Sequence, residues 1–243
     1  RMRVVFPTRL NTDRSDAEAA FDVISRDIHV KPGNAYFGRP NPQYPMYRFV
    51  DLSDGEKGFA VLNTGIREYE AMDTPDRRLA ITLFRAFTYR NCPIFGRWEV
   101  YPEMDLAQCI GPHEWTYALY PHVGDWTKGV FDEAEALNLP LESAQAGPHP
   151  GKLPKSLSFL EVHGGNVQIT AFKRAEDRAN SYVIRLFNPE NKSVKCSLKV
   201  WKPIKKAWLT NLNEERREKL EPQGNTINLK VEKKKIVTVE FQL

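Results

Sequence analysis

Cysteine is scarce in this sequence, and its spacing excludes the sites that cysteines usually build. The 243 residues contain three cysteines, Cys92, Cys109 and Cys196, and no CxxC pair. An odd number of widely spaced cysteines argues against a disulfide framework and against a structural zinc site. The pattern is consistent with a reducing compartment, and we therefore expect a cytoplasmic protein.

Long hydrophobic runs and a strong net charge are also missing. No apolar run approaches the ~20 residues that a membrane-spanning helix needs, so we expect no membrane partner. The formal net charge is +4, and the lysines of the last third alternate with strand-forming residues. This alternation predicts a solvated strand face and protected sheet edges, and it does not favour a nucleic-acid partner.

Strand-forming patterns dominate what remains. In the first 140 residues, turns separate short strand candidates, and two of these turns contain glycine, which is typical of hairpins. These candidates are Arg3 to Pro7, Tyr47 to Leu52, Phe59 to Leu62, Glu68 to Met72 and Arg78 to Phe87. The segment from Phe131 to Leu137 has the composition of a short helix, which Pro140 stops.

Two segments in this part are harder to assign. The first half of the segment from Asp16 to Ile28 is rich in alanine and favours a helix by propensity, whereas its second half alternates as a strand does. The density of proline and glycine from Lys31 to Pro45 forbids regular structure. Because that segment also carries aromatic residues, we expect an ordered loop there.

A segment rich in proline, residues 140–157, predicts a domain boundary, and we divide the chain into residues 1–150 and 151–243. Seven short strand candidates follow, and their spacing predicts a β-sandwich. They are Phe159 to His163, Val167 to Phe172, Ser181 to Phe187, Val194 to Trp201, Lys206 to Leu209, Thr226 to Val231 and Ile236 to Phe241. The segment from Asn213 to Leu220 is compatible with a helix, but we expect a charged loop.

The stretch from Gly111 to Trp126 resembles an active site at first sight. Its composition predicts a buried strand that Pro121 ends, and two histidines and two acids crowd its ends. A strand would place His113 and Glu114 on opposite faces, which disfavours a shared metal ion. We therefore expect no metal site, with His122 and Asp125 bonded to backbone in the turn.

The best candidate for contacting another molecule is the loop that follows Arg85. From Thr88 to Ile110 the sequence loses all periodicity, which in sheet proteins often marks function. Arg85, Arg90, Arg97 and Trp98 combine cations with a flat ring, a surface that suits sugars, carboxylates or another domain. The alternative is a loop that packs on its own sheet.

No catalytic motif stands out in this sequence. The Walker loop, GxSxG, GxGxxG and HExxH are all absent. Carboxylates that could serve a glycosidase pair are plentiful, but their positions in turns and alternating strands predict solvated faces. They are Asp51, Asp54, Glu68, Glu70, Glu176 and Asp177.

Several stretches, in order along nearly the whole chain, resemble the C-terminal region of glycoside hydrolase family 38, the α-mannosidases and related mannosyl-hydrolases. They are FVDLSDG (49–55) with FAVLN (59–63), Leu79 to Arg85, QCIGPHE (108–114) with YALYPHVGDW (117–126), and AFKRAED (171–177) with VIRLFNP (183–189). Together these stretches are specific, although no single one would be.

This resemblance implies an all-β fold, a large antiparallel super-sandwich of the galactose-mutarotase-like type followed by a smaller β-sandwich. It also implies extended chain from Asp16 to Ile28. The family's enzymes are retaining glycosidases whose aspartate nucleophile and sugar-coordinating zinc belong to an N-terminal α/β domain, and neither lies in the matching part. In some members an arginine of the C-terminal region reaches the active site. No motif assigns that role here, so Arg85, Arg90 and Arg97 stay candidates.

We therefore interpret the chain as a non-catalytic C-terminal segment that walls the substrate cleft and supports an N-terminal catalytic domain. Its partners would be that domain and a mannose-containing carbohydrate. The chain starts directly in a strand candidate, which is consistent with a piece of a longer protein. The alternatives are a free-standing carbohydrate-binding module and a structural domain that forms a homo-oligomer. The module would bind sugars on Trp98, Trp126, Trp201 or Trp208.

Overall fold

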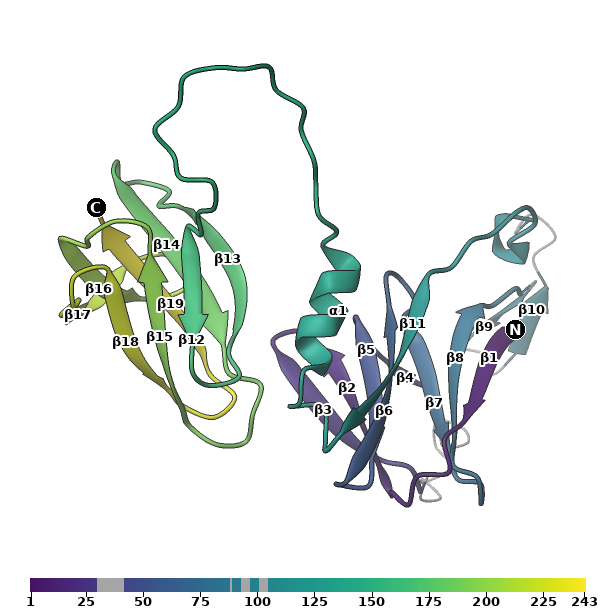
Figure 1. Cartoon of the computed structure of the whole chain (residues 1–243). Helices are drawn as coiled ribbons and strands as arrows, with labels where there is room; N and C mark the ends of the chain where they lie inside the picture. Colours follow the sequence, from purple (N-terminus) through teal and green to yellow (C-terminus); the bar gives the residue numbers. More distant parts are fainter. Residues whose placement is uncertain (30–41, 88, 93–96, 101–104) are drawn as a thin grey trace. The chain divides into compact units, whose positions relative to one another are not determined.

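The computed structural model describes residues 1–29, 42–87, 89–92, 97–100 and 105–243 (Figure 1). Every strand pair among these residues is antiparallel, which confirms the all-β prediction. The chain forms two compact units: Arg1–Ala20 with Ile24–Leu141, and Phe21–Val23 with Glu142–Leu243. No described helix has the length and apolar character that crossing a bilayer requires.

The first unit contains two large sheets and one hairpin. The four-stranded sheet has the order β1 (Met2–Pro7), β8 (Arg78–Phe84), β7 (Glu68–Met72), β4 (Tyr44–Pro45). The five-stranded sheet has the order β11 (Tyr117–Val123), β6 (Lys57–Asn63), β5 (Phe49–Ser53), β2 (Arg14–Ala19), β3 (Asp22–Asp27). The hairpin pairs β9 (Tyr89–Cys92) with β10 (Arg97–Val100), and a 3-10 helix spans Asp105–Gln108.

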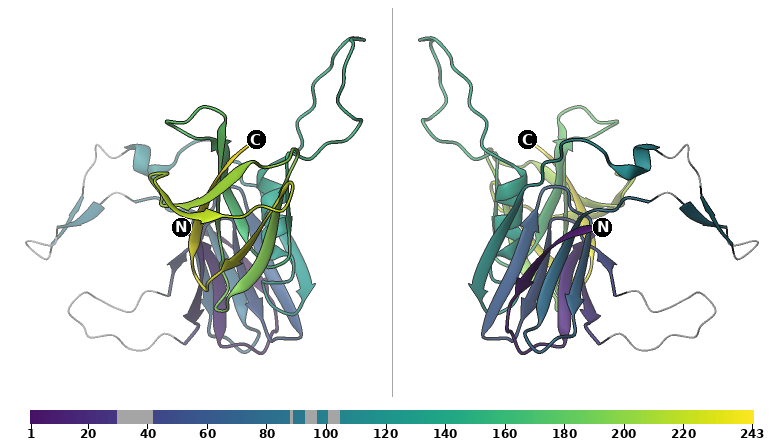
Figure 2. Two further views of the ribbon diagram at one scale, coloured as in Figure 1. Left: turned by 90° about the vertical axis from the view of Figure 1, so that its left-hand side faces the viewer. Right: turned by 90° about the vertical axis from the view of Figure 1, so that its right-hand side faces the viewer.

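Strand alternation explains how these two sheets share a core. Val50 and Leu52 of β5 lie in one hydrophobic cluster with Tyr69 of β7 and Leu79 of β8, and all four are fully buried. Because neighbouring strand residues point to opposite faces, Asp51 must point to the other face of the five-stranded sheet. There α1 (Val130–Asn138) lies along β6 and β5 (Figure 2).

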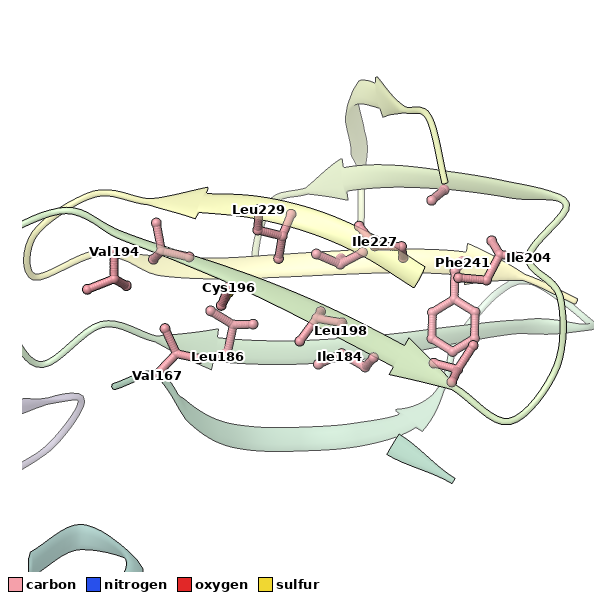
Figure 3. Close-up of a cluster of buried hydrophobic side chains, with 14 residues drawn as sticks. Val167, Ile184, Leu186, Val194, Cys196, Leu198, Ile204, Ile227, Leu229 and Phe241 are labelled. Atoms are coloured by element: carbon pink, nitrogen blue, oxygen red, sulfur yellow. The ribbon is translucent and has the colours of Figure 1, made fainter. Parts of the chain in front are cut away.

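The second unit is a smaller sandwich. One sheet has the order β12 (Leu160–His163), β15 (Val194–Val200), β18 (Thr226–Val231). The other has the order β13 (Gln168–Arg174), β14 (Ser181–Phe187), β19 (Ile236–Gln242), β16 (Lys206–Thr210), β17 (Arg216–Leu220). Leu198 and Ile227 of the first sheet meet Ile184 and Phe241 of the second in one buried cluster (Figure 3).

Two predictions from local sequence are wrong in this structure. The charged loop expected from Asn213 to Leu220 contains β17, an edge strand that pairs with β16. An edge strand needs backbone pairing on one side only, so it tolerates four consecutive exposed charged residues. Pro121 does not end its strand, because β11 continues to Val123 at the edge of its sheet, where proline's missing N–H faces solvent.

Two other predictions have different outcomes. The segment from Asp16 to Ile28 is extended, as the resemblance implied, and it forms most of β2 together with β3. Most of the loop expected from Lys31 to Pro45 lies outside the described residues, although Tyr44 and Pro45 form β4. In the segment from Asp16 to Ile28, strand pairing in the folded protein thus outweighs the helix propensity of the alanines.

The segment that leads into the second unit has no helix or strand. Residues 139–159 are exposed without exception, and the first unit ends within them at Leu141, before the boundary that the sequence predicted at residue 150. Exposed backbone without regular hydrogen bonding is where proteases cut most readily.

Brief trypsin treatment is expected to cut after Lys152 and Lys155, because both lysines lie in this exposed segment. Mass spectrometry should find paired fragments that meet at these two sites. The variant K152Q/K155Q should lose the pair while keeping its other cleavage products. Fragments that arise first inside the strands of either sandwich would contradict the expectation.

Candidate functional site

Arg85 is held at the end of β8 by a carboxylate. Its guanidinium nitrogens lie 2.8–3.1 Å from the carboxylate oxygens of Glu68, and the Thr82 hydroxyl donates to the same carboxylate at 2.6 Å. Burial raises the pKa of Glu68, but Arg85 and Thr82 lower it by more, so the net shift is downward. Arg85 therefore stands half-exposed in a fixed position, with its charge partly balanced.

The other candidates lie on the β9–β10 hairpin, so part of the expected irregular insertion is a strand pair. In its backbone register Trp98 faces Asn91, and Arg90 faces Glu99. Arg97 starts the second strand opposite Cys92. The side chains of this hairpin lie outside what the structure describes, so the roles of Arg90, Arg97 and Trp98 stay predictions.

Beside Arg85, three rings form a stack that the sequence did not predict. Phe84 and Trp115 lie nearly parallel, with centroids 5.8 Å apart, and the His113 ring lies 5.5 Å from Phe84 and 5.4 Å from Trp115. His113 Nε2 lies 2.6 Å from the carbonyl oxygen of Cys109. This histidine therefore serves the packing of the loop before β11.

A buried pair, Asp51 and His122, joins β5 to β11 across the strand between them. His122 Nε2 lies 2.9 Å from Asp51 Oδ1, and the two side chains are 2% and 0% exposed. His122 faces Gly58 of β6 in the strand register. A Cβ at Gly58 would lie 2.0 Å from Cε1 of the His122 ring, so only glycine leaves room for the ring to cross β6.

This pair belongs to a row of polar groups on one face of the five-stranded sheet. Asp16 of β2 faces Asp51 in the strand register. Burial raises the pKa of Asp16, although a hydrogen bond with Ser25 opposes the shift, and the negative charge of Asp51 adds to it. The solvated face expected for Asp51 is therefore wrong: the residue is fully buried.

The electrostatics of the pair reflect its burial. Burial raises the pKa of Asp51, and the hydrogen bond with His122 offsets this only in part. Burial lowers the pKa of His122, but Asp51 raises it by more, so the net shift is upward. Asp51 Oδ2 and His122 Nδ1 have no hydrogen-bond partner among the described residues. With almost no exposed surface, the pair cannot reach a substrate, and its contribution is structural.

The expectation for this turn was only half right. Asp125 does bond to backbone, because its Oδ1 accepts from the Thr127 N–H at 3.0 Å. His122 instead pairs with a side chain 71 residues away. No group of three or more metal-ligating side chains gathers anywhere in the described part of the chain.

Helix α1 covers this face of the sheet through aromatic and charged contacts. Phe131 meets Phe49 edge-on at 4.9 Å, and Trp126 packs against Phe131 at 5.9 Å. Arg48 lies over the Phe131 ring and bonds Glu18 at 2.6 Å. The stretch from Gly111 to Trp126, which resembled an active site, therefore takes part in the buried hydrophobic and ionic packing between the sheet and α1.

Comparison with known proteins places these motifs in one family. Residues 1–93 match the glycosyl hydrolases family 38 C-terminal domain, and residues 166–239 match the glycosyl hydrolases family 38 C-terminal beta sandwich domain. The chain belongs to glycosyl hydrolase family 38. Its two units thus correspond to the C-terminal regions of that family.

Individual relatives agree over the full length of the chain. It is 29% identical over 246 residues to "Alpha-mannosidase 2C1" of Mus musculus and 26% identical over 244 residues to "Putative mannosylglycerate hydrolase" of Halalkalibacterium halodurans. Both alignments cover 100% of the chain but only 21% and 25% of the relatives. The crystal structure of an α-mannosidase from Enterococcus faecalis V583 superimposes with a TM-score of 0.80 and 27% identity, covering 99% of this chain and 25% of that one.

The family 38 motif of the second unit, residues 171–177, is also explained by ionic contacts. Lys173 lies 2.6 Å from Glu214, and Glu214 accepts the backbone N–H of Glu176 at 2.9 Å. Glu176 and Asp177 form the bend between β13 and β14, as the sequence predicted. Glu214, which anchors this bend, lies outside the short stretches AFKRAED and VIRLFNP that carried the resemblance, so no local signal in the sequence pointed to it.

A second ion cluster in this unit surrounds a fully buried acid. Glu240 bonds Arg178 at 3.0 Å and Arg216 at 2.7 Å, and the Arg216 guanidinium covers the Trp208 ring at 3.5 Å. Burial raises the pKa of Glu240, but the two arginines lower it by more. The cluster ties the edge strand β17 and the β13–β14 bend to β19.

Gly58→Ala is expected to destabilise the chain by about 1–3 kcal/mol, because the new Cβ and the His122 ring cannot share one space. Gly65→Ala is the matched control, since nothing lies within 4 Å of a Cβ there, and it should change the free energy of unfolding by less than about 0.5 kcal/mol. Urea denaturation measures both variants. In a His122→Ala background, the added cost of Gly58→Ala should fall toward zero, and equal costs in both backgrounds would contradict the packing explanation.

An exposed ionic cluster in the first unit yields a pH prediction. His29 Nδ1 lies 2.6 Å from Asp73 and Nε2 lies 3.0 Å from Asp13, while Arg77 bonds Asp73 at 2.8 Å. The hydrogen bond with Asp73, and then that with Asp13, raises the pKa of His29.

The folded pKa of His29 is therefore expected above its unfolded value of about 6.5. The stabilisation by this cluster should be fully present below the unfolded pKa and lost as pH rises through the folded pKa. NMR titration of the imidazole measures the shift, and Asp73→Asn should lower the pKa. Asp125→Asn, at a distant exposed carboxylate, should leave it unchanged. A His29 pKa at or below 6.5 in the unsubstituted chain would contradict the assignment.

Proposed function

We propose that this chain is the non-catalytic C-terminal segment of an α-mannosidase-like glycoside hydrolase. In this proposal it walls the substrate cleft and supports a zinc-dependent catalytic domain that precedes it in the polypeptide. The observation that carries the proposal is the full-length match to about a quarter of longer relatives. A mannose-containing substrate and a cytoplasmic location, the latter predicted from the cysteine pattern, belong to the same proposal.

The ion-pair partners of the buried acids support a scaffold role. Glu18, Asp51 and Glu240 are each 5% exposed or less, and each is bonded to a cation or to histidine within its own unit. A glycosidase needs two acids that reach the scissile bond across a cleft. Acids that are sealed inside ion pairs serve the rigidity of the sheets instead.

The zinc that the family implies does not fit the described residues. His113 is bonded to a backbone carbonyl, and His122 is sealed against Asp51. These two histidines are therefore not available as zinc ligands for a reaction step. What the chain would supply to catalysis is positioning of the substrate and exclusion of water from the cleft.

Within this proposal, the segment from Arg85 through the β9–β10 hairpin is the part assigned to the cleft or to the domain interface. Arg85 supports this assignment, because it is fixed by Glu68 while remaining half-exposed. A cation held in place loses little conformational entropy when it meets a sugar or a carboxylate. Arg90, Arg97 and Trp98 would extend the same surface.

The carbohydrate-binding alternative needs open aromatic platforms, and three of its four tryptophans are already occupied. Trp126 packs against Phe131, and the Arg216 guanidinium covers Trp208. Trp201 contacts Phe159 at 5.4 Å and Tyr182 at 5.3 Å. These contacts favour the scaffold proposal, and self-association stays a prediction that sedimentation can measure.

The test combines the purified chain with the N-terminal portion of the Enterococcus faecalis α-mannosidase that lies outside the matched quarter. The chain alone should release no 4-nitrophenol from 4-nitrophenyl α-mannoside, whereas its addition should raise the melting temperature and the hydrolysis rate of the N-terminal portion. Hydrolysis by the chain alone at enzyme-like rates would refute the proposal, as would the absence of any effect on the N-terminal portion.

Variants then locate the contact surface. Arg85→Ala, Arg90→Ala, Arg97→Ala and Trp98→Ala should each lower the hydrolysis rate of the mixture by about 10-fold or more if they touch substrate. Arg217→Ala is the control, since Arg217 is an exposed arginine of the second unit that pairs only with Glu215 among the described residues. If all four variants behave like Arg217→Ala, this segment is neither cleft nor interface.

A further inference from the structure

The two large sheets of the first unit differ in width, and no described strand covers one end of the wider sheet. Five strands face four. Phe6 of β1 lies 6.0 Å from both Phe59 of β6 and Tyr117 of β11. The edge strand β1 therefore sits over β6 and the start of β11. No described strand of the four-stranded sheet lies beyond β1 to cover the rest of β11.

The core-facing side of β11 shows the consequence. Tyr117 packs against the core, and strand alternation puts Leu119 and Val123 on the same side. Leu119 pairs with Val61 of β6, which is fully buried. Leu119 is nevertheless 48% exposed and Val123 80% exposed. We call these two residues together with the free edge of β1 the open rim.

Of the two edges that meet at the open rim, β1 is the one that can accept another strand. β11 carries Pro121, which offers no N–H toward its free edge. β1 reads MRVVFP, with no proline before its last residue. Its internal cation, Arg3, is bonded to Glu70 on β7. The edge strand β17 of the second unit is protected by four charged residues, whereas β1 has no such protection.

We propose that an extended segment adds to β1 as a further strand and covers Leu119 and Val123. The occupant is a segment of the catalytic part of a longer family 38 polypeptide, with apolar residues on its core-facing side. The relatives contain enough further chain to supply such a segment, because about three quarters of their length lies outside the matched region. A strand in this position pairs its backbone with β1 and completes the narrower sheet. The inference rests on the proposed function, since it names where that function's partner docks.

The experiment compares L119K/V123K with L141K/L153K. Both variants place two lysines at exposed apolar positions, and the second pair lies in the exposed segment outside either sandwich. The probe is the N-terminal portion of the Enterococcus faecalis α-mannosidase, with affinity measured by isothermal titration calorimetry. The unsubstituted chain and L141K/L153K should bind equally, and L119K/V123K should bind at least about 10-fold more weakly, since covering a lysine with apolar chain is unfavourable. The melting temperature of L119K/V123K alone should stay unchanged.

Hydrogen exchange supplies the readout specific for strand addition. Binding should slow exchange of the β1 backbone amides at least about 10-fold, because new inter-strand hydrogen bonds protect them. The open-rim proposal would be overturned if binding left hydrogen exchange in β1 unchanged and was not weakened in L119K/V123K. That result would leave the proposed function standing. No binding by the unsubstituted chain would overturn both. A dimer of the chain alone that L119K/V123K abolishes in sedimentation would also overturn the proposal, because the occupant would then be a second copy.

Discussion

The buried pair of Asp51 and His122 is the contact on which the first unit depends. It reaches over β6 at Gly58 and couples the edge strand β11 to β5 near the middle of the sheet. Removing one partner would leave a buried polar group uncompensated, which costs several kcal/mol in proteins, about 3–5. The pair therefore selects one register for β11, and that register sets where the following turn and α1 lie on the sheet.

Buried acids paired with a cationic side chain also occur where other strands and loops are held to a sheet face. Glu18 anchors Arg48 beneath α1, and Glu240 holds two arginines on the second unit. Buried ion pairs contribute little net stability, because desolvation offsets their attraction. Their value here is specificity: each fixes one arrangement of neighbouring elements. A rigid arrangement is what a domain needs if its task is to position others.

The edges of the two sandwiches fit this interpretation. In the second unit the edge strand β17 carries charges that keep other strands away. In the first unit no described strand pairs with the outer edge of β1, and β11 of the facing sheet keeps two apolar side chains exposed. The edge strand β17 of the second sandwich is thus protected by charge, whereas the edge strand β1 of the first sandwich is not. A scaffold that continues into a larger polypeptide would have this asymmetry.

Local sequence was sufficient for most strands and for α1, because alternation, turn residues and Pro140 act within a few positions. It was also sufficient, through stretches in family order, to predict the two sandwiches. Tertiary structure alone decided that the charged segment around Glu218 is an edge strand and that β11 runs through Pro121. It alone joined His122 to Asp51, 71 residues apart. Periodicity reports only which face a residue takes, whereas strand order and register decide which residues meet on that face.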